Sequence, residues 1–423
     1  MKRGLVVVSF LICFQCTQAQ WIEIFNDTNF EFTDVKFLNN DTGFVVGDYL
    51  GAPYGRAVLR THNGGISWDT TVFDNALLMG LAIPSSNYIY VGGQDGLIYK
   101  SSDGGGNWNE INTFPIGNDD CMDYYFLNND TGFTIDRMGY VFRTVNGALN
   151  WTQVSTSTME QNDFPNSGKI QFLNDTLGFA ANGNKGHVIK TNDGGNTWYN
   201  IDIGDTNIKV NSIYMLNKDT GYVIGEKGRV AQTVNGGLSW NNVASPSLAA
   251  KDLLDIVFFT DSIGYIVGGK GFWSYNVPQE SFHGLIYKTV DGGNTWNIDD
   301  SVCCTQLTAI YAASDSVGYA TGWNGKILKI INANSVNVSE VEIKQSPLKI
   351  FPNPFSFRSI ITFTYPSASS HTEIIINDVN GREVVRYEVP SNSNRMQAHL
   401  PVMASGVYVA RLVGENASAR SEE

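Results

Sequence analysis

Short runs of alternating apolar and polar residues recur along the first three quarters of the chain, separated by polar turns. Gly96-Leu-Ile-Tyr-Lys-Ser101 and Gly284-Leu-Ile-Tyr-Lys-Thr289 are two such runs. Alternation with a period of two is typical of half-buried β-strands. The pattern therefore predicts many short strands joined by tight turns.

One turn recurs six times, and each copy ends in a tryptophan. Its form is Thr/Ser-x-Asn/Asp-Gly-Gly/Ala-x-x-Trp, and it ends at Trp68, Trp108, Trp151, Trp198, Trp240 and Trp296. Trp21 is a seventh tryptophan, without a turn before it. The steps between successive tryptophans are 47, 40, 43, 47, 42 and 56 residues. A period in the forties in a strand-rich chain predicts a β-propeller with one four-stranded blade per repeat.

A second motif gives the same number of repeats. It is an apolar or aromatic residue, a polar turn, and then Gly with an aromatic, as in Phe37-Leu-Asn-Asn-Asp-Thr-Gly-Phe44. Other copies start at Phe126, Phe172, Met215, Phe258 and Ala312, and we expect a degenerate copy at Leu81–Tyr88. Such turns join antiparallel strands. In each blade, strand a precedes this turn, b follows it, c leads into the Gly-Gly turn, and d starts at the tryptophan.

The last repeat lacks its fourth strand. It has strands a, b and c near residues 306–312, 318–322 and 326–330, but no tryptophan turn follows. Trp21-Ile-Glu-Ile-Phe25 has the pattern of a d strand. We therefore predict an all-β fold with a seven-bladed propeller over residues 20–333. Pairing of Trp21–Phe25 with Lys326–Ile330 would close the ring and remove both free edges.

The first 19 residues have the organisation of a secretory signal. Lys2 and Arg3 form a basic end, Leu5 to Phe14 an apolar run, and Thr17-Gln-Ala19 a small-residue cleavage site. We expect a signal peptide at residues 1–19, removed near Ala19. The apolar run is too short to span a membrane, and no apolar run of greater length occurs in the mature sequence.

Charge and cysteine content narrow the classes of function. The formal net charge is −13, and it becomes −15 when Lys2 and Arg3 are removed with the signal peptide. Without a basic run, this argues against nucleic-acid binding. Cys121, Cys303 and Cys304 remain, and buried free thiols fit them better than a disulfide between the adjacent pair. Their spacing matches no zinc site, so we expect neither metal nor cofactor.

The repeat pattern ends near residue 331, and a second domain follows. Residues 334–346 are polar and read as a linker. Residues 347–423 contain the runs Leu348–Phe355, Ile374–Val385 and Ser405–Leu412, joined by Asn-Gly and Ser-Gly turns. This predicts a small C-terminal β-sandwich of Ig-like form.

Two family resemblances follow from these motifs. The six tryptophan turns resemble the Asp-box (BNR) repeats of sialidase-like proteins, and their spacing is most similar to the photosystem II stability and assembly factor family. That resemblance implies a protein-binding role. Residues 348–412 resemble the type A C-terminal sorting domain of type IX secretion substrates, which implies a Bacteroidetes-like bacterium and a secreted or surface-attached protein. The polar, acidic end Gly414–Glu423 departs from that family, which places sorting in doubt.

Long loops suggest a binding surface. The b–c and d–a connections of a propeller share one face, which we call the loop face. Two b–c loops are long, residues 47–55 in blade 1 and 269–284 in blade 6, and the blade 7 turn carries an aromatic residue. Exposed aromatic side chains suit a glycan or a peptide, while a self-buried cap is the alternative. The candidates are Tyr49, Tyr54, Phe272, Trp273, Tyr275, Phe282 and Trp323.

Basic residues recur at the b–c turns as well. They are Arg56, Arg137, Lys185, Lys227, Arg229 and Lys326. A ring of positive charge at one channel mouth would attract a carboxylate or an acidic peptide, whereas ordinary solvated turn residues are the alternative. We add Arg56, Arg137 and Arg229 to the candidate binding residues.

Catalysis has one candidate set. Asp34, Asp123 and Asp255 hold equivalent inner-strand positions in blades 1, 3 and 6, and paired carboxylates are what a glycoside hydrolase needs. Inner-strand aspartates also cap hairpins. The leading interpretation is a secreted, non-catalytic binding or scaffold protein for a protein or glycan partner, and the alternative is a sialidase- or glucanase-like hydrolase that uses these aspartates.

Overall fold

The computed structural model describes most of the chain. The described residues are 10–13, 21–51, 54–73, 77–111, 120–155, 168–181, 187–204, 209–243, 245–249, 251–269, 283–303, 305–331, 348–351, 360–365, 372–378, 382–399 and 407–413. They form two compact units, Ala19–Ser335 and Met1–Gln18 with Val336–Glu423.

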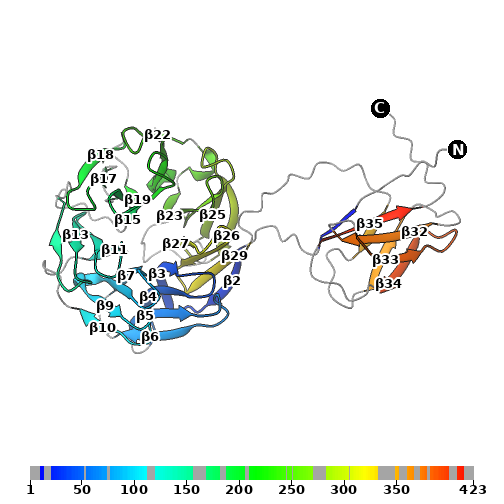
Figure 1. Ribbon diagram of the computed structural model, residues 1–423, viewed down its shortest axis with the longest axis horizontal. Helices are drawn as coiled ribbons and strands as arrows, with labels where there is room; N and C mark the ends of the chain where they lie inside the picture. Colours follow the sequence, from blue (N-terminus) through cyan, green and yellow to red (C-terminus); the bar gives the residue numbers. More distant parts are fainter. Residues whose placement is uncertain are drawn as a thin grey trace. The chain divides into compact units, whose positions relative to one another are not determined.

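The first unit consists of seven four-stranded antiparallel sheets around a common centre, with the a strands innermost (Figure 1). Blades 1 to 3 are β3 (Phe30–Phe37), β4 (Gly43–Tyr49), β5 (Gly55–Thr61), β6 (Asp69–Phe73); β7 (Leu78–Ala82), β8 (Ile89–Gly93), β9 (Ile98–Ser101), β10 (Asn109–Ile111); and β11 (Cys121–Phe126), β12 (Gly132–Asp136), β13 (Val141–Thr144), β14 (Thr152–Gln153). Blades 4 and 5 are β15 (Lys169–Phe172), β16 (Gly178–Ala181), β17 (His187–Thr191), β18 (Tyr199–Asp202); and β19 (Val210–Met215), β20 (Gly221–Gly225), β21 (Val230–Thr233), β22 (Asn241–Asn242). Blades 6 and 7 are β23 (Asp252–Phe258), β24 (Gly264–Gly269), β25 (His283–Thr289), β26 (Asn297–Cys303); and β27 (Leu307–Ala312), β28 (Val317–Gly322), β29 (Lys326–Ile331), β2 (Trp21–Asn26). Short 3-10 turns lie at Gln94–Gly96, Glu226–Gly228 and Pro246–Leu248.

The predicted closure of the ring is confirmed. β2 pairs antiparallel with β29, from Trp21 opposite Ile330 to Asn26 opposite Lys326. Trp21 is 5% exposed, and its ring packs edge-on against Tyr265 of blade 6 at 5.5 Å. Buried aromatic area of this kind is a large part of core stability. The N-terminal strand therefore completes blade 7 in both hydrogen bonding and packing.

The repeated tryptophan turn is built by local hydrogen bonds, as blade 1 shows. The Thr61 hydroxyl oxygen accepts the Gly65 N–H at 2.9 Å, and the Asn63 side-chain oxygen accepts the Ser67 N–H at 3.0 Å. Gly64 has φ +67° and Gly65 φ +85°, a region that other residues rarely adopt. The chemistry of these residues is thus fully used in forming the turn.

Stacked aromatic rings join neighbouring blades at several of the junctions among the described residues. Phe37 stacks on Tyr319 of the preceding blade at 3.6 Å, and Trp68 packs edge-on against Phe37 at 6.4 Å. The same arrangement recurs at Phe126 with Tyr90 and Trp151, Phe172 with Phe133 and Trp198, and Phe258 with Tyr222 and Trp296. Each such pair stabilises the ring by about 0.5–1.5 kcal/mol beyond the buried area.

Two details of the repeat differ from the sequence-based prediction. The degenerate motif of blade 2 lies at residues 83–90 and not at Leu81–Tyr88, because Ala82 pairs with Tyr90 and it is Tyr90 that stacks on Phe126. Where a Gly-Gly turn is present, strand d starts one residue after the tryptophan, as Asp69 follows Trp68.

The second unit is a small β domain with two sheets. They are β1 (Phe10–Cys13), β35 (Val407–Val413), β32 (Glu373–Asp378) and β33 (Glu383–Glu388), and β30 (Lys349–Phe351), β31 (Ile360–Thr364) and β34 (Arg395–His399). Phe363, Ile374 and Ile376 are fully buried in its core. β1 falls within the expected signal peptide and pairs antiparallel with β35.

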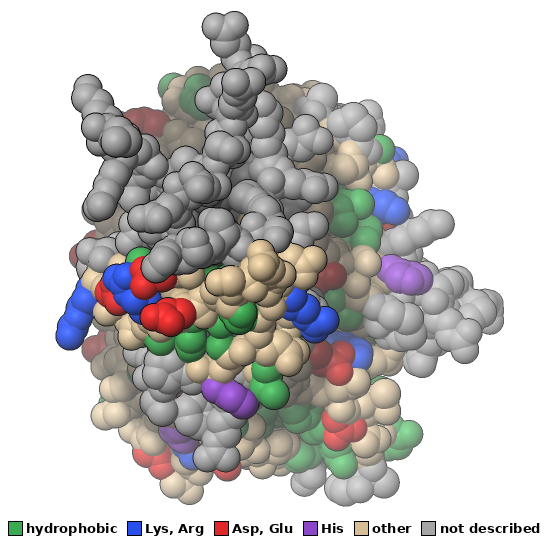
Figure 2. All heavy atoms as spheres, turned by 90° about the vertical axis from the view of Figure 1, so that its right-hand side faces the viewer, with side chains coloured by type: hydrophobic (Ala, Val, Ile, Leu, Met, Phe, Trp, Pro, Cys, Tyr) green, Lys and Arg blue, Asp and Glu red, His purple; other side chains and the backbone are tan. Residues whose placement is uncertain are grey.

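Charges on the second unit are locally paired. Arg386 lies 2.5 Å from Glu373 and 2.7 Å from Glu383. Figure 2 shows acidic and basic side chains next to one another, with no large area of one sign among the described residues of that view.

Candidate functional site

The three inner-strand aspartates meet two lysines at the centre of the propeller. Asp34, Asp123 and Asp255 are each at most 5% exposed. Lys169 of blade 4 lies 3.2 Å from Asp34 and 3.9 Å from Asp255. Lys36 lies 3.2 Å from Asp123 and 3.7 Å from Asp34. Because Lys169 contacts carboxylates of blades 1 and 6, the cluster bridges the ring at this level. We call these five residues the axial cluster.

Each aspartate also accepts a backbone N–H from the following blade. The bonds are Leu81 N–H to Asp34 at 3.1 Å, Ile170 N–H to Asp123 at 3.0 Å and Ile310 N–H to Asp255 at 3.0 Å. The Ser212 hydroxyl donates to the other oxygen of Asp255 at 2.8 Å. The remaining oxygens of Asp34 and Asp123 accept from Lys169 and Lys36. All six carboxylate oxygens therefore have partners within the protein.

The electrostatics of the cluster are uneven. Burial alone would raise the pKa of Asp34, but Lys169 and Lys36 outweigh it and hold this pKa below its usual value. Burial raises the pKa of Asp255 in spite of Lys169. Burial opposes the charge on both lysines, yet the neighbouring carboxylates keep the pKa of Lys36 and Lys169 above the usual value. The fold thus favours the charge of Asp34 and disfavours that of Asp255.

The two lysines were absent from the predicted site, although the sequence carries a signal for one of them. Lys169 precedes Phe172 by three residues, as Asp34 precedes Phe37 and Asp123 precedes Phe126. It therefore occupies the same inner-strand position as the aspartates. The arrangement does not fit hairpin capping, because each aspartate accepts a backbone N–H from the following blade and is ion-paired with a lysine at the centre of the ring. The three carboxylates link blades to one another.

On the loop face, blade 1 carries an aromatic stack. The Phe30 ring lies 5.0 Å from Tyr49 and 5.8 Å from Phe25 of the closing strand. Above it the b–c loop exposes Tyr54, at 74%, and Leu50, at 39%. Two of the predicted aromatic residues thus lie in or beside one patch, Tyr49 packed within the stack and Tyr54 open to solvent.

Arg56 lies beside this patch and is paired. Its Nε is 3.4 Å from Asp48, and Glu31 stands directly opposite Asp48 on the neighbouring strand. Burial raises the pKa of Asp48 to about 6, with Arg56 lowering it and Glu31 raising it. Burial also raises the pKa of Glu31. At this end of blade 1, the two carboxyl groups of Asp48 and Glu31 lie near the one guanidinium of Arg56.

The other basic residues at b–c turns have partners of their own. Arg137 lies 3.2 Å from Asp120, Lys326 is paired with Glu23, and Arg229 donates to the Ile203 carbonyl at 3.2 Å. Lys227 is exposed, and Lys185 lies outside the described residues. Of the two alternatives that the sequence left open, a ring of positive charge or ordinary turn residues, the ion pairs favour the second, because nearby acids reduce the positive field at Arg56, Arg137 and Lys326.

Of the remaining predicted aromatic residues, Trp323 lies within the described ranges. Trp323 is half-buried in the b–c turn of blade 7, where its backbone N–H donates to the Gln306 carbonyl at 3.0 Å and its backbone carbonyl accepts from the Thr305 hydroxyl at 2.6 Å. The predictions for Phe272, Trp273, Tyr275 and Phe282 fall outside the described residues.

Cys121 is buried and free, and burial raises the pKa of its thiol to about 12. No helix in the described ranges has the length and apolar character needed to cross a membrane.

The fold and its turns define a class, a seven-bladed Asp-box β-propeller followed by a small β domain. The chain belongs to the photosynthesis system II assembly factor YCF48 family, whose model matches residues 14–164 and 148–251, more than half of the chain. Residues 349–422 match the secretion system C-terminal sorting domain. That domain indicates secretion to the cell surface or the extracellular space.

Solved structures share the propeller fold. The chain is similar to YCF48 bound to D1 peptide, with a TM-score of 0.59 and 17% identity over 76% of this chain and 97% of that chain. YCF48 from Cyanidioschyzon merolae has a TM-score of 0.59 and 19% identity over 75% and 100%. The WD40 propeller domain of Doa1 has a TM-score of 0.51 and 9% identity over 72% and 96%. No curated protein matches the chain.

Proposed function

We propose that this protein is a secreted, non-catalytic propeller that binds a peptide segment of a protein partner through the loop face of blades 7 and 1. The observation that carries the proposal is the patch in which Tyr54 and Leu50 are exposed above the packed rings of Phe30 and Tyr49. Exposed aromatic groups on a rigid base lose little conformational entropy on binding and often supply most of the binding energy.

Two further observations support a binding role. The inner-strand aspartates are buried, ion-paired and hydrogen-bonded within the fold, which gives them a structural role in joining the blades. A relative of the same fold has been solved with a bound peptide. A peptide ligand would use main-chain and side-chain contacts that a rigid loop face can offer.

The sorting domain fits this role. We infer that the leader is removed near Ala19, that the chain crosses the outer membrane by the type IX route, and that the host is a Bacteroidetes-like bacterium. The match to the sorting domain supports the inference. Fractionation of the native host is the test, and intact protein confined to the cytoplasm would contradict it.

The binding proposal is tested with a peptide array probed by the full chain, beside a panel of glycoside substrates. The expected result is binding to a subset of peptides and no turnover. Tyr54→Ala and Trp323→Ala should each weaken the best peptide by about 1–3 kcal/mol, the scale for an aromatic anchor. Ile66→Ala is the matched control, since this side chain is 86% exposed on a c–d turn, away from the loop face. Glycoside turnover lost in Asp123→Asn would overturn the proposal.

A further inference from the structure

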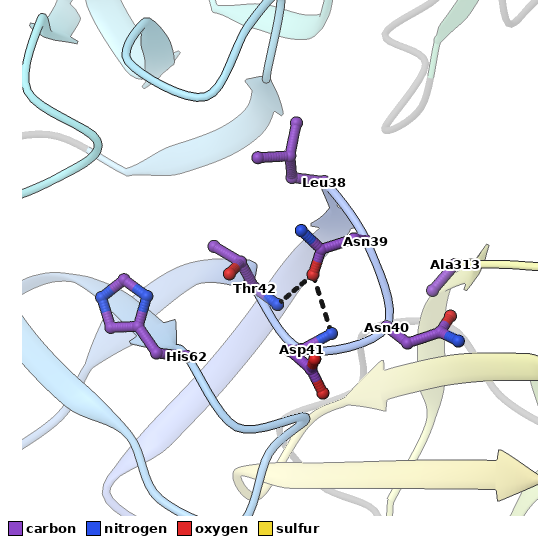
Figure 3. A pocket seen from close by; sticks show the side chains of 7 residues that line it. All are labelled: Leu38, Asn39, Asn40, Asp41, Thr42, His62 and Ala313. Carbon is purple, nitrogen blue, oxygen red and sulfur yellow. Dashed lines mark hydrogen bonds between the residues drawn. The ribbon is translucent and has the colours of Figure 1, made fainter.

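A polar hollow lies on the opposite face, where the a–b and c–d turns are found. Its volume is about 600 Å³, and it is lined by residues 38–42 and His62 of blade 1 and by Ala313 of blade 7. The hollow is shallow and widely open to solvent, so a ligand there would be held from one side. Figure 3 shows the a–b turn between His62 on one side and Ala313 on the other, with Asn40 on the Ala313 side.

The turn holds its backbone rigidly and leaves polar side chains to the hollow. The Asn39 side-chain oxygen accepts the Asp41 N–H at 2.9 Å and the Thr42 N–H at 2.8 Å (Figure 3). The Asn40 carbonyl accepts the Tyr319 hydroxyl at 3.0 Å. Among the described residues, the side chains of Asn40, Thr42 and His62 have no hydrogen-bond partner. Their donors and acceptors are therefore available to a ligand.

Blade 3 provides an internal comparison because its turn has the same eight residues, Phe126–Phe133. Asn128 makes the same two bonds at 2.9 and 2.8 Å, and the Asn129 carbonyl accepts the Tyr90 hydroxyl at 3.0 Å. Only the neighbours differ. Blade 3 has Val145 at the position of His62, and its preceding blade has Pro84 at the position of Ala313. Of the polar side chains that line the hollow, the His62 imidazole is thus the one that the junction of blades 2 and 3 lacks.

We propose that this hollow binds an uncharged sugar residue. Sugar hydroxyls both donate and accept, which suits the amide of Asn40, the hydroxyl of Thr42 and the imidazole of His62. Leu38, 40% exposed, gives an apolar contact for the C–H face of the ring. The Asp41 carboxylate in the lining accepts from hydroxyls and disfavours an anionic ligand. Within the described residues, no three His, Cys, Asp or Glu side chains are grouped as metal binding requires.

Saturation-transfer NMR on the full chain tests this, with methyl glycosides of glucose, galactose, mannose and N-acetylglucosamine as probes and N-acetylneuraminic acid as the anionic comparison. We expect signals from at least one neutral glycoside and none from the anion. His62→Val, which installs the residue that blade 3 already carries, and Asn40→Ala should each weaken binding about tenfold. Asn129→Ala, the same change in the identical turn, should leave it unchanged.

Three outcomes would overturn the proposal. The first is the absence of a saturation-transfer signal from every neutral glycoside. The second is an equal loss of glycoside affinity in Asn40→Ala and Asn129→Ala. The third is a loss of glycoside affinity in Tyr54→Ala while His62→Val binds as wild type does. The first two leave peptide binding at the loop face untouched, because that function uses the other face. The third would assign the sugar to the loop face.

Discussion

The axial cluster makes different predictions for two aspartates that are equally buried. Asp34 and Asp255 are 2% and 5% exposed, and both contact Lys169. The fold lowers the pKa of Asp34 and raises that of Asp255. A lowered pKa means that the folded state stabilises the charge, and a raised pKa means the reverse. The isosteric change to Asn should therefore destabilise the fold more at Asp34 than at Asp255.

The expected magnitudes follow from the contacts. Asp34→Asn removes the carboxylate that both lysines share, and breaking a buried pair costs about 3–5 kcal/mol. That corresponds to a fall in Tm of roughly 5–15 °C for a unit of this size. Asp255→Asn keeps the acceptor for Ile310 N–H and removes a charge that the fold disfavours, but Lys169 loses a carboxylate neighbour, so the cost at pH 7 should be smaller than that of Asp34→Asn, about 1–2 kcal/mol.

Thermal and urea unfolding of the full chain at pH 7 measure both variants, with Glu110→Gln, an exposed carboxylate on β10, as control. The Asp34 contribution is present above the unfolded pKa and disappears as the pH falls through the lower folded value, so Asp34→Asn should approach wild type in acid. Equal destabilisation by Asp34→Asn and Asp255→Asn would refute the reasoning. If Asp34→Asn kept wild-type stability but lost a glycoside hydrolase activity that the wild type has, Asp34 would be a catalytic residue.

Three further predictions concern the ring, the loop face and the turns. Deletion of residues 20–26 should lower the Tm strongly, and Trp21→Ala alone should cost about 3–5 kcal/mol, because the last blade loses its fourth strand or its buried ring; an unchanged melting curve would count against closure. The folded pKa of Asp48, about 6, lies above its unfolded value, so its contribution to stability is present in acid and is lost as the pH rises through 6. Between pH 4.5 and 7.5, the free energy of unfolding in urea should therefore fall for wild type relative to Asp48→Asn, by on the order of 2–3 kcal/mol. Parallel curves of this free energy against pH would contradict the prediction. Asn63→Ala should cost about 1–2 kcal/mol, since the Ser67 N–H loses its acceptor, while Asn63→Asp should be nearly neutral because Asp103 fills the same role in blade 2; equal losses on thermal unfolding would show that the acceptor is unimportant.

The blade count and the closure were predictable from sequence because both rest on local chemistry. The turn that ends at Trp68 needs its glycines and its Asn63 oxygen within eight residues, so every copy is visible in the sequence. Trp21 could be assigned to blade 7 because the last repeat lacks its strand d, while the N-terminus carries one strand d that belongs to no other repeat. The register of blade 2 was not predictable, since Ile89 replaces the usual glycine and cross-strand pairing alone selects Tyr90.

The site was harder to predict because it depends on residues that are distant in sequence. The three aspartates share one position in the repeat, which indicated correctly that they lie on inner strands. Their pairing with Lys36 and Lys169 depends on side chains that cross the ring between blades. Sequence could not decide whether the basic b–c residues form a positive ring or are ordinary turn residues, because the acid beside Arg137 comes from the d–a connection. Such partners meet only once the propeller has closed.

The most direct test of the central claim is isothermal titration of the best array peptide into the full chain and two matched variants. Tyr54, exposed at 74%, lies on the loop face, and Ile66, exposed at 86%, lies on a c–d turn. The account predicts that Tyr54→Ala weakens the peptide by about 1–3 kcal/mol and that Ile66→Ala leaves the affinity unchanged. Loss of affinity in Ile66→Ala with Tyr54→Ala unaffected would contradict it.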